Sequence, residues 1–335
     1  MNPRYRRWLI PGLLIALLVV VVIASLAGKA DAETSAPQVV SRLSDGRINE
    51  SSGLVLSADD DDRAYTVNDS GGAPVVYTVS VSTGRTLGAA TVDADFVDTE
   101  ALSSDGAGTL WVADTGDNQA SRTDVALYAL SEPGDGTTSA SARRYPITYP
   151  GGPLDVEALV VAPRTGAMYL ISKGLFGGTV FSLPDPLVED RPNEAVAMAG
   201  DVPGLVTDAA FTPDGRYVVA RDYTEAYVLD PVTWEILSSE DLPSVDQGET
   251  LAMEATGQSF LVGSEGTDSP LIRVPFTPPA APDDPAASSP APTATPAVSA
   301  PPADGNGFAG ATWFWAVVVV ALLTAISAAA TTKRR

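Results

Sequence analysis

Short acidic motifs recur along this chain, each at the point where a run of alternating apolar residues begins. Asp98 and Glu100 stand in DTEAL, and Asp155 and Glu157 stand in DVEAL. Histidine and cysteine are absent from the sequence, so the commonest general base and the usual ligands of zinc are missing. Any chemistry must therefore use carboxylates, hydroxyls, lysine or arginine. Carboxylate oxygens that converge are ligands for a hard cation, and Ca²⁺ is expected before Mg²⁺.

The candidate site residues occupy two kinds of position, the start of one apolar run and the end of the next. Eight acidic residues at these positions are the candidate metal ligands: Asp98, Glu100, Asp114, Asp155, Glu157, Asp208, Glu249 and Glu265. If the site is catalytic, Glu100 or Glu157 is the candidate base. Lys173 and Arg221 would then stabilise developing negative charge. Lys173 is the only lysine between residues 33 and 310, and a structural ion pair is the other interpretation of it.

The elements that carry these residues are short strands. In the clearest unit, Val97 to Leu130, apolar residues recur with a period of two, and turn residues separate three runs. The unit occurs five times, with anchors 48, 57, 50 and 42 residues apart at Leu54, Leu102, Leu159, Ala209 and Leu251. Repeats of this length in a chain of strands are typical of propeller blades.

We therefore predict an all-β fold, a β-propeller over residues 37–276 with five four-stranded blades, or six as the alternative. The fifth unit lacks a fourth strand, and the run from Pro37 to Leu43 is expected to fill that place and close the ring, which removes exposed sheet edges. Inner strands run antiparallel to second strands, so both sets of candidate residues should meet at one end of the central channel. A carboxylate-lined face with one lysine and one arginine is the expected result.

Both ends of the chain carry membrane-type segments. Residues 1–32 place three arginines before a long apolar run and predict a signal peptide, or an uncleaved signal anchor. Residues 277–307 are rich in proline and alanine and predict an extracellular stalk. Residues 310–330 are long enough for a transmembrane helix, and residues 331–335 form a basic cytoplasmic tail. We expect a protein held in the cell membrane by its C-terminal helix, with the bulk of the chain extracytoplasmic.

The charge of the chain restricts its partners. A formal net charge of −22 argues against nucleic acid. Cations, and an extracellular ligand or protein of unknown identity, are the expected partners. An acidic surface that only maintains solubility is the alternative.

The motifs SSGL, DTEAL, DVEAL and DTGDN, followed by QGE and SEG, resemble the exported phytase-like and "SdiA-regulated"-type β-propellers of bacteria over residues 45–276. The resemblance is closest to their uncharacterised, membrane-anchored actinobacterial relatives. It implies Ca²⁺ held by carboxylates in or near the channel and, for the phytases proper, phosphomonoester hydrolysis assisted by lysine and arginine. The chain departs from phytases in having five units in place of six blades, and in its few basic residues.

Two functions follow from these observations, and a third remains open. The first is a membrane-tethered extracellular propeller that binds Ca²⁺ and a ligand or protein partner through its acidic face. The alternative is a Ca²⁺-dependent hydrolase of phosphoesters, or of esters or lactones. A purely structural surface protein is the third.

Overall fold

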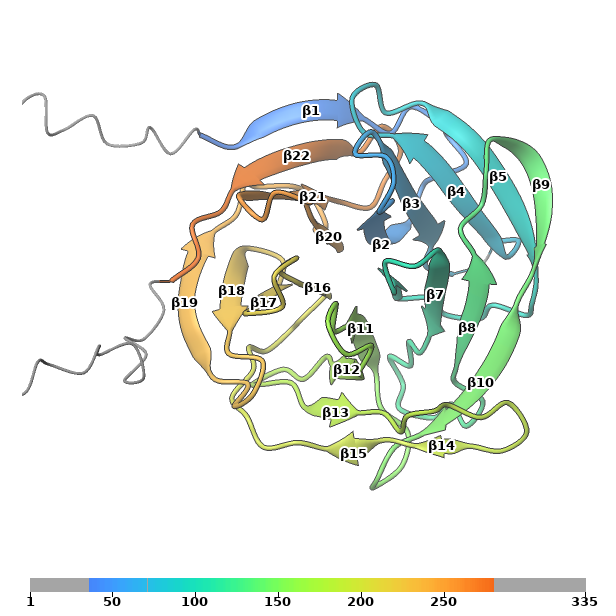
Figure 1. The fold of residues 1–335 in the computed structure, drawn as a ribbon, viewed down its shortest axis with the longest axis vertical. Helices are drawn as coiled ribbons and strands as arrows, with labels where there is room; N and C mark the ends of the chain where they lie inside the picture. The colour runs from blue at the N-terminus through green and yellow to red at the C-terminus, as the bar shows by residue number, and fades with distance from the viewer. Residues whose placement is uncertain (1–35, 71, 280–335) are drawn as a thin grey trace, which may run out of the picture. The chain divides into compact units, whose positions relative to one another are not determined.

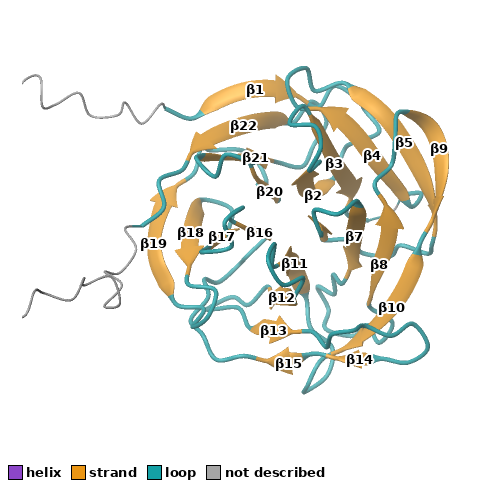
Figure 2. Ribbon diagram, in the orientation of Figure 1, coloured by secondary structure: helices purple, strands orange, loops and turns teal. Residues whose placement is uncertain are grey.

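A computed structural model describes residues 36–70 and 72–279, which form strands and loops but no helix (Figure 2). The predicted signal segment, stalk, transmembrane helix and basic tail lie outside these residues, apart from the first residues of the stalk. Within the described part, no helix is long and apolar enough to cross a membrane.

Five sheets stand around a common centre, as the prediction of five blades requires (Figure 1). Blade 1 contains β2 (Ser51–Leu56), β3 (Arg63–Asn68), β4 (Val75–Ser80) and β5 (Thr86–Asp93). Blade 2 contains β6 (Ala101–Ser104), β7 (Thr109–Asp114), β8 (Ala126–Ser131) and β10 (Arg143–Thr148). Blade 3 contains β11 (Val156–Val161), β12 (Met168–Ser172), β13 (Val180–Ser182) and β15 (Val196–Ala197). Blade 4 contains β16 (Asp208–Phe211), β17 (Val218–Arg221), β18 (Glu225–Leu229) and β19 (Ile236–Asp241).

Blade 5 is completed by the N-terminal strand. It contains β20 (Thr250–Met253), β21 (Ser259–Gly263), β22 (Pro270–Pro275) and β1 (Gln38–Arg42). β1 pairs antiparallel with β22, so the strand that starts the described chain occupies the outer position of the last blade. The ring is therefore closed by hydrogen bonds between segments more than 220 residues apart, and the edge of β22 is covered.

Two further strands join neighbouring blades and were not predicted. β9 (Gly136–Ser141) pairs parallel with β5 of blade 1, and β14 (Asn193–Glu194) pairs parallel with β10 of blade 2. β9 has the sequence GTTSAS and is largely exposed, so it lacks the apolar alternation by which a strand is recognised. The close approach of the chain around β9 to β5 requires glycine at position 88, where a Cβ would lie 2.3 Å from the carbonyl oxygen of Gly134.

The core consists of apolar layers between adjacent blades. Alternate residues of each strand face the neighbouring sheet, which gives five clusters, one at each blade interface. Tyr65 and Phe260 are 2% and 0% exposed, while Trp111 and Tyr169 pack partly buried against these clusters. Burial of a large apolar side chain contributes about 1.5–3 kcal/mol, so these clusters are the main source of stability expected for a ring without disulfides.

Strand direction decides what each end of the ring presents. Each inner strand starts, and each second strand ends, at the same face, which we call the carboxylate face because Asp69, Glu100 and Glu157 lie there. β1 starts and β22 ends at the opposite face. The described chain therefore enters and leaves the ring on the side away from the carboxylates.

Candidate metal centre

The loops that lead into the inner strands carry most of the acidic side chains. The loop before β6 brings Asp98 and Glu100 to the carboxylate face. Asp114 Oδ1 fixes this loop by accepting hydrogen bonds from the N–H groups of Val97 and Asp98 at 3.1 and 2.8 Å. Thr99 N–H donates to the carbonyl oxygen of Asp69 at 2.8 Å, and this bond ties the loop to the end of β3. Backbone geometry therefore holds Asp69 and Asp98 together.

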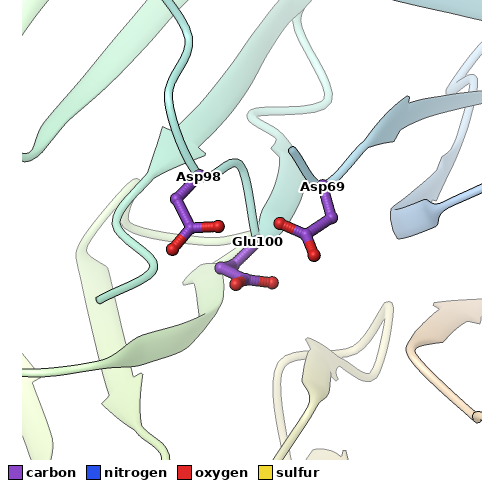
Figure 3. A group of neighbouring side chains, drawn as sticks. All are labelled: Asp69, Asp98 and Glu100. Carbon is purple, nitrogen blue, oxygen red and sulfur yellow. The ribbon is translucent and has the colours of Figure 1, made fainter. Parts of the chain in front are cut away.

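Five carboxylates form two groups that share one member. Oxygen atoms of Asp69, Asp98 and Glu100 lie within 4.8 Å of one another (Figure 3). Oxygen atoms of Glu100, Asp155 and Glu157 also lie within 4.8 Å of one another. Glu100 therefore stands between two sets of ligands that are each close enough to hold a cation.

Gly116 makes the space between these carboxylates. A Cβ at this position would lie 2.5 Å from Glu100 Oε1 and 2.7 Å from Asp98 Oδ2. Its N–H donates to the carbonyl oxygen of Asp98 at 3.0 Å, so the backbone itself packs against the carboxylate pair. Only glycine fits here without displacing a side chain that could bind metal.

Burial and mutual repulsion raise the pKa of several carboxyl groups of this centre. Burial raises the pKa of Glu100 well above its usual range, and Glu157, Asp69 and Asp98 raise it further. Burial and the neighbouring Asp98 raise the pKa of Asp69. Burial also raises the pKa of Glu157, although Lys173 opposes that shift. A bound cation would remove the repulsion, so the site is electrostatically suited to positive charge.

Lys173 compensates one side of the centre. Its Nζ donates to Glu157 Oε1 at 2.9 Å and lies 5.4 Å from the ring centroid of Tyr223. Burial lowers the pKa of Lys173, but Glu157 and Tyr223 outweigh this effect and leave the pKa above its ordinary value. The ammonium group is therefore charged at neutral pH.

Glu249 and Glu265 lie on the blade 5 side and belong to neither group. Glu249 is 4% exposed, and its Oε1 accepts a hydrogen bond from Gln247 Nε2 at 3.2 Å. No described residue hydrogen-bonds to its Oε2. Burial, Glu249 and Glu50 raise the pKa of Glu265 to about 7. Acidic charge thus continues around the channel beyond the two groups.

Asp208 and Arg221 join blade 4 to blade 5. Arg221 is fully buried, and its Nη1 donates to the carbonyl oxygens of Thr250 and Gly263 at 3.0 and 3.2 Å. Asp208 Oδ2 accepts a hydrogen bond from Leu251 N–H at 2.6 Å. Burial lowers the pKa of Arg221 to about 10, so it remains a cation at neutral pH. Its place between the blades does not give it access to a ligand in the channel.

Asp114 also has a structural position. Its Oδ1 holds the loop described above, and its Oδ2 pairs with Arg122 Nη2 at 3.0 Å. Asp117, the second acid of DTGDN, accepts hydrogen bonds from the N–H groups of Ser121 and Arg122 and donates its own N–H to Asp155 Oδ1 at 2.7 Å. The DTGDN loop therefore positions the centre but does not add free carboxylates to it.

Asp69 and Tyr223 were not among the candidate site residues, although a repeated spacing in the sequence points to Asp69. In four blades, a residue one or two positions beyond the second strand donates its N–H to a carbonyl oxygen in the loop before the inner strand. The acceptor lies two positions before Ser52, Glu100, Glu157 or Glu249. The donor and acceptor pairs are Asp69 and Glu50, Gly116 and Asp98, Lys173 and Asp155, and Glu265 and Gln247, at 2.9–3.0 Å. Three of these pairs are 18 residues apart and the first is 19.

Comparison with known proteins adds little to this geometry. No protein-family model matches the chain, and no curated protein matches it. Among solved structures, the glutaminyl cyclase of Myxococcus xanthus matches with 13% identity over 71% of this chain and 95% of that chain, at a TM-score of 0.47. An auxiliary nutrient binding protein from Bacteroides thetaiotaomicron matches with 9% identity over 68% of this chain and 69% of that chain, at a TM-score of 0.40. Likeness at this level carries no inference about function.

Proposed function

We propose that this β-propeller binds Ca²⁺ at the mouth of its channel and uses the ion to hold an extracellular ligand or partner. The observation that carries the proposal is the convergence of Asp69, Asp98 and Glu100 within 4.8 Å around the space left by Gly116. An ion equidistant from three such oxygens lies within about 2.8 Å of each, so shifts of a few tenths of an ångström reach the 2.3–2.6 Å typical of Ca²⁺.

The donor set fits Ca²⁺ better than a transition metal. All five side chains of the two groups are carboxylates, and hard oxygen ligands select Ca²⁺ and Mg²⁺. Ca²⁺ also accepts irregular geometry with six to eight ligands, whereas Mg²⁺ requires a near-ideal octahedron. A bound ion whose remaining positions face the channel would be able to bind an anionic group of a ligand.

We further propose that the propeller is displayed outside the cell, tethered to the membrane by residues 310–330. The apolar segment and the proline-rich residues 277–307 before it support this. The described chain begins and ends at the face opposite the carboxylates.

A Ca²⁺-dependent hydrolase of the phytase-like or lactonase type is the second candidate. It is supported by the raised pKa of Glu157, which burial brings toward the range of a general base, and by the charged Lys173 beside it. Turnover of a phosphoester, ester or lactone that is lost both in EDTA and in Lys173→Ala would establish this function. Arg221 has no place in the proposed mechanism because it is buried between blades.

Calorimetric titration of Ca²⁺ into the purified full-length protein tests the proposal. We expect saturable binding that Asp98→Asn and Glu100→Gln each weaken at least tenfold. The matched control is Glu194→Gln, which changes the same charge at an exposed position. Absence of binding to the native protein, or equal binding by all variants, would contradict the assignment.

A further inference from the structure

The two carboxylate groups differ in one respect, which is the presence of a tethered cation. Glu157 of the second group receives the Lys173 ammonium at 2.9 Å. Asp69, Asp98 and Glu100 form no ion pair with any described residue. One half of the centre therefore contains a positive charge supplied by the chain, and the other half has none.

The position of Lys173 is part of the propeller repeat. The same backbone hydrogen bond places Asp69 in blade 1, Gly116 in blade 2, Lys173 in blade 3 and Glu265 in blade 5. Blade 3 is the one of these four that has a basic residue there. Because the backbone fixes the position, the ammonium group is directed to the channel mouth by the fold itself.

We propose that Lys173 takes the place of a second metal ion in this centre. The channel then binds one Ca²⁺ at Asp69, Asp98 and Glu100, while Lys173 excludes another from Glu100, Asp155 and Glu157. This inference rests on the Ca²⁺ binding proposed above and concerns its stoichiometry. An ammonium ion 2.9 Å from Glu157 Oε1 occupies the space and balances the charge that a second cation would need.

The buried carboxyl group of Glu249 is a second acidic group that the charge of Lys173 stabilises. Glu249 is 4% exposed, its Oε2 has no described hydrogen-bond partner, and Lys173 is the strongest of the charges that lower its pKa. Without Lys173, Glu157 would have no ion-pair partner among the described residues. The chain should then recruit an ion from solution.

The test counts Ca²⁺ ions per molecule in the purified full-length protein, by calorimetry and by metal analysis after free ions are removed. We expect one ion for the native protein and two for Lys173→Gln. Lys173→Arg keeps the tethered charge and should bind one. Arg85→Gln removes an exposed cation elsewhere and should also bind one. The double variant Lys173→Gln/Glu157→Gln lacks a ligand of the second group and should return to one.

Each outcome bears on the inference. One ion in Lys173→Gln, or two in the native protein, overturns it but leaves the proposed Ca²⁺ function standing. No ion in any of these proteins overturns both. Lys173→Gln that folds only in millimolar Ca²⁺ supports the inference, because the ion then replaces the missing ammonium. Lys173→Gln that stays unfolded at every Ca²⁺ concentration contradicts it.

Discussion

Glu100→Gln should stabilise the metal-free protein at pH 8 and do little at pH 5. A carboxylate oxygen of Glu100 lies within 4.8 Å of an oxygen of each of the four other carboxylates of the centre. Glu100 is buried, with 5% of its surface exposed. Its pKa is raised in the folded state, so folded protein holds a proton that unfolded protein releases above pH 4.5. Stability therefore falls as pH rises above 4.5, and glutamine, which does not ionise, abolishes this loss.

The stabilisation that Glu100→Gln can give has an upper limit, which is the free-energy cost of keeping Glu100 protonated in the folded protein. A carboxyl that stays protonated in the folded state costs about 1.36 kcal/mol for each pH unit above its unfolded pKa. This gives a limit of about 5 kcal/mol at pH 8 and under about 1 kcal/mol at pH 5. The hydrogen bond that Ser52 Oγ donates to Glu100 Oε2 is long, at 3.3 Å, so its change costs little. We expect a net gain of about 2–4 kcal/mol at pH 8, or about 5–15 °C in Tm.

Thermal and urea unfolding of the full-length protein in EDTA, at pH 5 and pH 8, measure this difference. Glu194→Gln makes the same chemical change on an exposed strand residue. It should change the free energy of unfolding by no more than about 0.5 kcal/mol at either pH. With saturating Ca²⁺ the order should reverse, because the native protein then gains binding energy that the variant has lost. Equal gains at both pH values, or a loss at pH 8 in EDTA, would refute the electrostatic argument.

Three further substitutions or deletions test other parts of the structure. Gly116→Ala should weaken Ca²⁺ binding at least tenfold in calorimetry, because its Cβ would lie 2.5 Å from Glu100 Oε1; Gly46→Ala, with open space around it, should bind normally. Arg221→Met should lower the free energy of unfolding in urea by about 2–4 kcal/mol, since it removes the hydrogen bonds from Nη1 to the buried carbonyl oxygens of Thr250 and Gly263; an unchanged urea midpoint would show that these bonds do not hold blade 4 to blade 5. Deletion of residues 38–42 should expose β22 and produce association in light scattering, whereas a stable monomer would show that ring closure is dispensable.

The repeat made the fold predictable, because each blade carries its own apolar alternation and the anchors recur at similar intervals. The closing role of β1 could also be predicted, since the fifth unit lacked a strand and the first run had no partner. β9 could not be predicted from such reasoning. Its pairing depends on the parallel approach to β5 made possible by Gly88, and its side chains are too exposed to leave a pattern.

The site was only partly predictable for a different reason. Position in the repeat indicates which residues reach the carboxylate face. It does not indicate which carboxylate oxygens already accept hydrogen bonds from the protein. Asp114 and Asp208 stand at repeat positions, yet hydrogen bonds to neighbouring N–H groups occupy them. Asp69 directly follows β3 as Lys173 directly follows β12, so its position at the carboxylate face could be predicted from the repeat.

Cations of the chain pair with carboxylates at some positions around the channel and not at others. Arg122 pairs with Asp114, Lys173 pairs with Glu157, and Arg221 lies buried beside Asp208. Asp114 and Glu157 are thus ion-paired within the chain, whereas the oxygens of Asp208 accept hydrogen bonds from the N–H groups of Ala209 and Leu251. Asp69, Asp98 and Glu100 form no ion pair among the described residues, although burial raises the pKa of two of them. If Ca²⁺ binds as proposed, this group is the expected place for the ion, because its carboxylate oxygens match the ligand preference of Ca²⁺.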